Sequence, residues 1–314
     1  MRKDTRPVVL ILGAGAVGLS LAGKLAKVAS VYAACRPRHA EAIRQRGLDM
    51  KGIWGEGSVY DISCIAGAGE ALPAPDFVLI TAKGTDTLAI CEEYAPVLRD
   101  RPVISLQNGI GNEEIISSFT SMVIGGTITT NFAIEGPGTV KVLRESGPVS
   151  LGLWSAGPGS EILDRLIALL RSAGIPVEAS SDIRAGKWTK ALLNIAVNPL
   201  TALLGKPVGT VENGYLREIV TALIEETFAV MDAENIHLAW KSAGEYLNYL
   251  YTVQIPDFAP VYTSMYYDLR EGKRTEIELL NGYVALLGKR HSIPTPYNHC
   301  IANLVRFREP ERIS

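Results

Sequence analysis

A strand-like run that leads directly into a glycine-rich turn restricts the fold of this chain more than any other stretch. Val8 to Leu12 is a continuous aliphatic run, a pattern typical of a strand that is buried on both faces. The turn Gly13-Ala14-Gly15-Ala16-Val17-Gly18 follows at once, and residues 19–28 have helical spacing. Strand, glycine turn and helix in this order predict the first unit of a doubly wound, Rossmann-type sheet.

The glycines of this turn meet the requirements of a bound dinucleotide. Gly13 permits a tight turn, Gly15 lets a pyrophosphate approach the backbone, and Gly18 lets the helix pack closely on the strand. The N–H groups at the helix start, at Ala16 and Val17, would then point at the phosphates. A glycine-rich turn of some other α/β protein is the alternative, and the strand and helix on either side favour the dinucleotide.

The end of the second expected strand, about Ser30 to Ala34, indicates which dinucleotide is preferred. An NAD site usually has an acidic residue here that binds the ribose 2′-hydroxyl. The chain has Arg36 and Arg38 instead, and no acidic residue before Glu41. Guanidinium groups suit a 2′-phosphate, so the position favours NADPH, with a solvated basic loop as the alternative.

Polar residues also follow two further buried strands, expected at residues 76–83 and 101–106. The first strand ends at Lys83, and the second leads into Gln107-Asn108-Gly109. Ligands gather at the carboxyl ends of strands in open α/β sheets. Lys83 and Asn108 are therefore candidates for the ribose and nicotinamide side of the cofactor, although Asn-Gly is also a common turn pair.

The rest of the first half has β character and then ends in a helix. Residues 125–133, 139–143 and 149–153 are expected to form strands that extend the sheet, because Gly-Pro turns separate them. Ser160 is expected to cap a helix over residues 161–173, and residues 175–179 form a last short strand. The sequence thus predicts a first domain of residues 1–180 and a second of residues 181–314.

The second half is predicted to be all-helical, and its first helix carries an unusual polar row. Between Lys187 and Leu204 nearly every face is apolar, yet Lys190, Asn194 and Asn198 recur at i, i+4 and i+8. An unpartnered buried amide costs about 1–3 kcal/mol, so this row needs partners in the protein, in water or in a ligand. Lys187 could share the same side.

Further helices are expected at residues 211–233, 242–254, 257–271, 275–289 and 296–308. Two polar positions stand out in them. Ser264 is expected within an aromatic-rich helix, where an exposed or backbone-bonded serine is the alternative. Glu276 is expected in the first turn of a helix, where the helix dipole alone would favour an acid.

Composition argues against several classes of partner. The 47% hydrophobic and 20% charged residues are those of a globular protein, and the net charge of −2 gives no reason to expect nucleic acid or a membrane surface. Four scattered cysteines without a CxxC pair indicate thiols in a reducing cytoplasm, so we expect a cytoplasmic protein. The four histidines lack metal-ligand spacing, and we expect no metal.

The ordered set of motifs resembles the ketopantoate reductase (2-dehydropantoate 2-reductase) family over nearly the whole chain. The motifs are Gly13–Gly18, Thr81-Ala82-Lys83, Gln107-Asn108-Gly109-Ile110-Gly111, Lys187–Asn194 with Val197–Thr201, Thr263-Ser264-Met265, and Arg274–Ile277 with Asn281-Gly282. The resemblance implies an N-terminal Rossmann-type domain and an all-helical C-terminal domain. It also implies NADPH-dependent reduction of 2-dehydropantoate to pantoate, a step of pantothenate biosynthesis.

The resemblance also implies roles for single residues. Lys190 would be the general acid that protonates the carbonyl oxygen, and Glu276 would hold the developing hydroxyl and position that lysine. Asn194, Asn198, Ser264 and Asn108 would bind the polar groups of the substrate. The expected cofactor contacts are Gly13, Gly15, Ala16, Val17, Gly18, Arg36, Lys83, Asn108 and Glu276.

The chemistry agrees with these residue types, and three alternatives stay open. A lysine can supply the proton if burial brings its pKa down from about 10.4. The substrate could instead be another 2-oxo acid, or the protein could bind NADPH without catalysis. For the polar row, a cleft that binds the substrate is the favoured explanation, and hydrogen bonds within the protein are the alternative. A homodimer is compatible with the sequence, although no residue argues for it.

Overall fold

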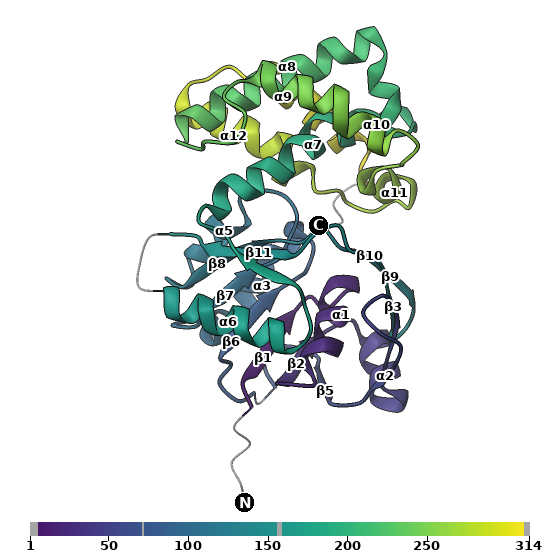
Figure 1. Cartoon of the computed structure of the whole chain (residues 1–314), viewed down its shortest axis with the longest axis vertical. Helices are drawn as coiled ribbons and strands as arrows, with labels where there is room; N and C mark the ends of the chain where they lie inside the picture. The colour runs from purple at the N-terminus through teal and green to yellow at the C-terminus, as the bar shows by residue number, and fades with distance from the viewer. Residues whose placement is uncertain (1–5, 71, 156–158, 311–314) are drawn as a thin grey trace, which may run out of the picture. The chain divides into compact units, whose positions relative to one another are not determined.

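An eight-stranded sheet organises the N-terminal part of the chain (Figure 1). The computed structural model describes residues 6–70, 72–155 and 159–310. In spatial order the strands are β12 (Val177–Ala179), β11 (Val149–Leu153), β8 (Val123–Thr127), β7 (Val103–Ser105), β6 (Phe77–Ile80), β1 (Val8–Leu12), β2 (Ser30–Ala34) and β5 (Ile62–Ile65). The six strands from β5 to β8 are parallel, and in chain order they run 3-2-1-4-5-6, as in the Rossmann fold.

The aliphatic run at β1 is continuous because both faces of the sheet are covered. Val9 and Ile11 belong to one core with α1 (Ala16–Leu25) and α6 (Ser160–Ser172). Leu10 and Leu12 belong to another core on the opposite face. That second core includes residues of α3 (Thr87–Glu93), α4 (Ala95–Leu98) and α5 (Asn112–Ser117). A strand buried on both sides has no solvent face on which polar residues would alternate.

A second, four-stranded sheet packs against α1. Its order is β4 (Gly57–Val59), β3 (Leu48–Gly52), β10 (Thr139–Arg144) and β9 (Asn131–Gly136), and α2 (Pro37–Arg46) precedes β3. The prediction that all strands after residue 123 extend the main sheet is therefore wrong in part. The expected single strand at 125–133 is two strands, because the chain leaves β8 of one sheet and enters β9 of the other. Strand β10 pairs in parallel with β3, a partner about ninety residues away that no local pattern reveals.

The C-terminal part is all-helical, as predicted (Figure 1). Its elements are α7 (Ile183–Leu204), the turn η2 (Val208–Glu212), α8 (Gly214–Ala233), α9 (Ala243–Tyr249), the π-helical turn η3 (Leu250–Gln254), α10 (Ile255–Phe258), α11 (Ser264–Arg270), the turn η4 (Ile277–Leu279), α12 (Asn281–His291) and α13 (Pro296–Arg308). One core runs through them, and Leu192, Ile195 and Ala196 of α7 are fully buried in it.

Three helix predictions need correction. The expected helix over 257–271 is broken, because Val208 N–H donates to Val261 O and Gly209 N–H to Ala259 O, which keeps this stretch outside the helix. The expected helix over 275–289 begins at Asn281. Ser160 is the first residue of α6, and its N-cap is Gly159.

The chain separates into two compact units. The sheet unit comprises the residues up to Gln107 together with 112–183, and the helical unit comprises 108–111 together with 184–314.

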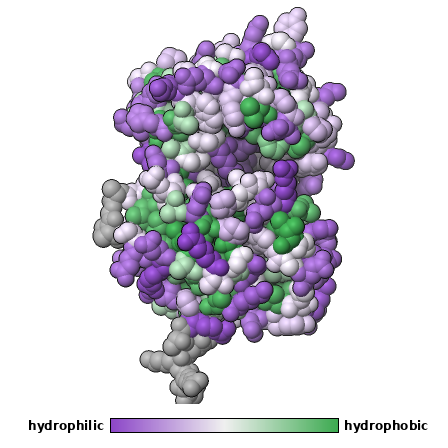
Figure 2. All heavy atoms as spheres, viewed as in Figure 1, coloured by the Kyte–Doolittle hydropathy of each residue, from purple (hydrophilic) through white to green (hydrophobic). Residues whose placement is uncertain are grey.

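Hydrophilic and hydrophobic residues are interspersed on the face shown in Figure 2. Among the described residues, no helix combines the length and apolar character needed to cross a membrane. The predicted cytoplasmic location and homodimer stay predictions.

Candidate active site

The glycine turn after β1 is packed against the end of β6. Gly13 has a φ of +74°, and a Cβ added there would lie 2.2 Å from Cβ of Ala82. A Cβ at Gly18 would lie 2.4 Å from Oγ1 of Thr81 and 3.1 Å from Cγ2 of Ile11. Thr81 Oγ1 also donates to Gly13 O at 3.2 Å. Both glycines are therefore required by the fold itself, in the roles expected of them.

Gly15 differs from Gly13 and Gly18 because no residue that the structure describes crowds it. A Cβ added at Gly15 would be 3.9 Å from its nearest neighbour, Gly13 O. The residue is the N-cap of α1, directly before Ala16 and Val17 in the first turn. A side chain here would occupy the space in front of the helix N-terminus, where a phosphate group binds. The arrangement thus fits a pyrophosphate without further change.

The remaining cofactor candidates of the sheet unit lie at the same edge of the sheet. Arg36 follows β2 and is the N-cap of α2, and Lys83 follows β6 and is the N-cap of the short turn η1 (Gly84–Asp86). Both side chains are exposed. Strands β2, β1 and β6 are adjacent and parallel, so their carboxyl ends meet at one edge. The order of the strands reverses between β1 and β6, which is where open α/β sheets bind ligands.

The Gln107–Gly111 motif crosses from one unit to the other. In the sheet unit, Gln107 Nε2 donates to Ala82 O at 3.1 Å and to Thr87 Oγ1 at 2.8 Å. In the helical unit, Ile110 N–H donates to Leu279 O at 2.9 Å. Gly109 has a φ of +81°, and a Cβ there would lie 2.6 Å from Cβ of Leu279. The Asn-Gly pair thus lies in a bend of the chain, and it is part of the helical unit.

Lys190 is the first residue of the polar row on α7. Its Nζ donates to Asn108 Oδ1 at 2.8 Å. Burial lowers the pKa of Lys190 to about 8, with the positive charge of Lys187 acting in the same direction and the carboxylate of Glu276 opposing both. Lys187 is buried and lies close enough to act on Lys190, so the second cation left open by the sequence shares this environment.

The polar row continues along α7 toward α11. Asn194 is half-buried and Asn198 is buried, and eight residues of helix separate Lys190 from Asn198 by about 12 Å. Thr201 Oγ1 donates to Asn198 O at 3.2 Å and lies 3.4 Å from Thr263 Oγ1. This brings the far end of the row to the start of α11.

Ser264 and Glu276 occupy positions different from those expected. Ser264 is exposed and is the first residue of α11, whose N-cap is Thr263. Glu276 is half-buried and is the residue before η4, whereas the N-cap of α12 is Leu280. The helix dipole of α12 therefore does not explain this acid, whose carboxylate raises the pKa of Lys190.

Sequence reasoning missed the role of Asn281 and Pro199. Pro199 lies inside α7 and has no N–H, so it cannot bond the carbonyl of Ile195. Asn281 Nδ2 donates to that carbonyl at 3.1 Å and also to Asn298 Oδ1 at 3.0 Å. The signal was present, because a proline inside an otherwise helical pattern leaves a carbonyl that needs a donor.

Among the described residues, no group of three or more His, Cys, Asp or Glu side chains is placed to hold a metal ion.

Comparison with known proteins gives the family. The model "Ketopantoate reductase PanE/ApbA" matches residues 9–156, and the model of its C-terminal domain matches residues 182–309. The chain belongs to the ketopantoate reductase family. It is therefore an oxidoreductase of this family.

Relatives of this family extend over nearly the whole chain. The 2-dehydropantoate 2-reductases of Pyrococcus horikoshii and Aquifex aeolicus are each 31% identical, with 96% of this chain and 97% and 96% of theirs covered. A PanE/ApbA family ketopantoate reductase from Ralstonia eutropha is 31% identical, with a TM-score of 0.84 over 96% of this chain and 98% of that one. A D-mandelate dehydrogenase with NADH and anilino(oxo)acetate is 25% identical, with a TM-score of 0.81 over 96% and 98%.

Proposed function

We propose that this protein reduces 2-dehydropantoate to pantoate with NADPH, a step of pantothenate biosynthesis. The observation that carries the proposal is Lys190, a lysine with a pKa of about 8 that bonds Asn108 and is influenced by Glu276. The names of the full-length relatives supply the substrate. Residues 1–180 would bind the cofactor, and residues 181–314 the substrate.

Lys190 is proposed as the general acid. Reduction of a 2-oxo group leaves an alkoxide that must receive a proton, and an acid works best when its pKa lies near the working pH. With a pKa of about 8, Lys190 is mostly protonated at neutral pH and is a far stronger acid than an ordinary lysine. Glu276 raises this pKa, so it keeps enough of the ammonium form for the reaction.

Neutral groups along α7 are proposed to bind the substrate. Asn194 and Asn198 carry amides, and Ser264 at the start of α11 carries a hydroxyl. Amides and hydroxyls can donate hydrogen bonds to a carboxylate without adding a charge that would pair with it. The charge of Lys190 therefore remains available for the carbonyl oxygen.

The glycine turn is proposed to hold NADPH, which supplies the hydride when it is bound. Gly15 leaves the N-terminus of α1 open to the pyrophosphate, in front of Ala16, Val17 and Gly18. Arg36 at the end of β2 would bind the 2′-phosphate, and Lys83 at the end of β6 would contact the ribose side. Asn108 and Glu276 would lie toward the nicotinamide.

A panel of 2-oxo acids tests the proposal. Parent protein is assayed with 2-dehydropantoate, an aryl 2-oxo acid and an unbranched 2-oxo acid, each with NADPH and with NADH. We expect kcat/KM to be highest for 2-dehydropantoate with NADPH, by roughly tenfold or more over the other acids. The likeness to a D-mandelate dehydrogenase makes an aryl acid the second candidate, and a preference for it would replace the first. Oxidation of neither cofactor with any acid would favour a binding protein without catalysis.

Replacing Lys190 with alanine separates catalysis from cofactor binding. We expect Lys190→Ala to lower kcat by about 10²–10⁴-fold, the usual contribution of a general acid. The dissociation constant for NADPH, measured by fluorescence titration, should stay within about twofold, since the proposed phosphate contacts lie in the sheet unit. Reduction of 2-dehydropantoate by this variant at the parent rate would remove Lys190 from the mechanism.

A further inference from the structure

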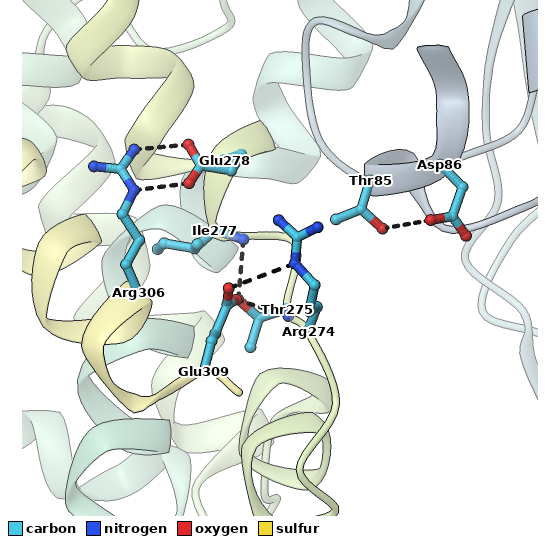
Figure 3. A network of polar contacts seen from close by, with 8 residues as sticks. All are labelled: Thr85, Asp86, Arg274, Thr275, Ile277, Glu278, Arg306 and Glu309. Carbon is cyan, nitrogen blue, oxygen red and sulfur yellow. Dashed lines mark hydrogen bonds and ion pairs between the residues drawn. The ribbon is translucent and has the colours of Figure 1, made fainter. Parts of the chain in front are cut away.

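The segment that carries Glu276 has little regular structure of its own. It connects α11, which ends at Arg270, to α12, which begins at Asn281, and contains only the three-residue turn η4. Such segments are more mobile than regular elements, so the placement of a carboxylate on one depends on how the residues beside it are anchored. Two anchors are present, and both come from the C-terminal end of α13 and the residue after it (Figure 3).

The first anchor is Thr275, the residue before Glu276. Its N–H and its Oγ1 both donate to Glu309 Oε1, at 2.8 and 2.5 Å. Its Oγ1 also accepts from Ile277 N–H at 3.2 Å, which closes the backbone around Glu276. Thr275 is 1% exposed and the Glu309 side chain is 8% exposed. Hydrogen bonds to a buried carboxylate are among the strong ones, so this anchor is stiff.

The second anchor is Glu278, two residues after Glu276. The guanidinium of Arg306 forms a bidentate ion pair with its carboxylate. Nε donates to Oε1 and Nη2 donates to Oε2, each at 2.7 Å. Arg306 Nη1 is itself held by Asn303 Oδ1 at 2.7 Å. A Cβ added at Gly282 would lie 2.9 Å from Glu278 Oε2, so glycine leaves the room that this pair needs. The pair is partly exposed, so its contribution is geometric more than energetic.

We propose that Arg306 of α13 and Glu309, its C-cap, are positioning residues, which hold Glu276 beside Lys190 by fixing the backbone on both sides of it. The inference deepens the proposed function and rests on it for the catalytic meaning of Lys190. Neither residue touches the substrate in this account. Their effect is transmitted through Thr275 and Glu278.

The charges around each group give the direction of the effect. Lys190 faces the cation of Lys187 and the carboxylate of Glu276. Glu309 faces Arg274, whose Nε is 3.9 Å from Oε2, and Arg306. If the anchors are loosened, Glu276 moves away from Lys190 while Lys187 stays on the same helix. The pKa of Lys190 then falls below its present value of about 8.

A matched pair at Thr275 tests this without any substrate. Thr275→Val removes the hydroxyl and keeps the shape, whereas Thr275→Ser keeps the hydroxyl. The midpoint of Lys190 is followed by NMR in full-length protein labelled with ¹³C-lysine, and Lys190→Arg assigns the signal. Glu276→Gln sets the full size of the shift that loss of the carboxylate produces. We expect Thr275→Val and Glu309→Ala to move the midpoint down toward that of Glu276→Gln, and Thr275→Ser to keep the parent value.

Turnover gives the second readout. If the midpoint falls from about 8 to about 7, the protonated fraction of Lys190 at pH 8 falls about fivefold, and kcat should fall with it while KM for NADPH stays constant. Arg306→Lys, which cannot form the bidentate pair with Glu278, should shift the midpoint of Lys190 in the same direction as Thr275→Val but by a smaller amount. If Thr275→Val does not fold, the midpoint of Lys190 in Arg306→Lys serves as the test instead.

The possible results separate the two proposals. A midpoint that is equal in Thr275→Val and Thr275→Ser, while Glu276→Gln shifts it, would mean that α13 only stabilises the fold. A midpoint unmoved by Glu276→Gln would overturn the inference at its premise. Failure of the parent protein to reduce any 2-oxo acid would contradict the proposed function. It would leave the positioning of Glu276 open to test, because the titration of Lys190 does not depend on turnover.

Discussion

At the scale of single residues, the proposed chemistry depends on opposing influences on one lysine. Burial and Lys187 favour the neutral amine of Lys190, and Glu276 favours the ammonium. The balance leaves a pKa of about 8, between an unreactive ammonium and an uncharged amine. Asn108 accepts a hydrogen bond from Nζ in either state, since an amine and an ammonium both donate. The lysine can therefore lose its proton without losing that partner.

The pH dependence of turnover follows from this balance. In the proposed mechanism reduction requires the ammonium, so kcat for the 2-oxo acid should fall as pH rises through about 8. Oxidation of the 2-hydroxy acid requires the amine, so kcat in that direction should rise through the same midpoint. Steady-state rates from about pH 6 to about pH 10 in both directions check this. A fall in the reduction rate only near pH ~10, the value of an ordinary lysine, would show that Lys190 is not perturbed.

Cofactor preference is also decided by single residues. Arg36→Ala should lower kcat/KM for NADPH by about 10–100-fold, because a charge-assisted hydrogen bond contributes about 1.5–3 kcal/mol. The value for NADH should change little, since NADH has no 2′-phosphate. Arg38→Ala, two residues further on and also exposed, is the matched comparison. Equal losses with NADPH and NADH would place Arg36 elsewhere than at the 2′-phosphate.

At the scale of elements, α7 shows how a helix can carry a proline inside a core. Pro199 leaves Ile195 O without its helical donor, and Asn281 of α12 supplies one from the side. The same asparagine bonds Asn298 of α13, so three helices meet at one amide. The bond from Asn281 to Ile195 O links α7 to the start of α12, which directly follows the segment that carries Glu276.

A double-mutant cycle measures how far the Asn281 side chain substitutes for the backbone donor that Pro199 lacks. Asn281→Ala should cost about 1–3 kcal/mol in the free energy of unfolding, because it leaves a buried carbonyl unpaired. In the background of Pro199→Ala the cost should be smaller, since alanine at this position restores a backbone N–H that can reach Ile195 O. Urea unfolding of the four proteins gives the coupling energy. Equal costs in both backgrounds would mean that Asn281 acts only through Asn298.

The elements also show how far local patterns extend. Strands β1, β2 and β11 have the predicted bounds, because each is a short stretch whose β character is visible in its own five residues. The second sheet was missed, because β10 pairs with the distant β3. The break between α10 and α11 was missed for the same reason, since Val208 bonds Val261 across more than fifty residues. Local periodicity cannot register such pairings.

At the scale of the whole molecule, the candidate residues within each unit come from segments far apart in sequence. The order of the motifs in the chain selects the candidate residues, and the strand order explains why Gly13, Arg36 and Lys83 share one edge of the sheet. The partnership of Asn108 with Lys190 could not be predicted, because it depends on how the loop packs on η4. Local spacing placed Asn108 only at the end of a strand.

Cofactor binding should be visible across the whole chain as a pattern of protection. NADPH at about 100 times its dissociation constant should stabilise the folded protein by about 2.7 kcal/mol. Hydrogen exchange of the amides at Gly15–Gly18 and at Arg36 should slow most, and the amides of β4 should not change. Protection confined to the helical unit would contradict the proposed cofactor site.

Residues 108–111 have a consequence for any attempt to recombine this protein. They belong to the helical unit, although they are encoded within the sheet unit, since Ile110 bonds Leu279 and a Cβ at Gly111 would meet Tyr283. A chimera spliced once near residue 183 would join a foreign helical half to the wrong loop. The two units thus cannot be exchanged between proteins at a single splice point. A second splice that carries Asn108–Gly111 with its own helices would be needed to transfer specificity between members of the family.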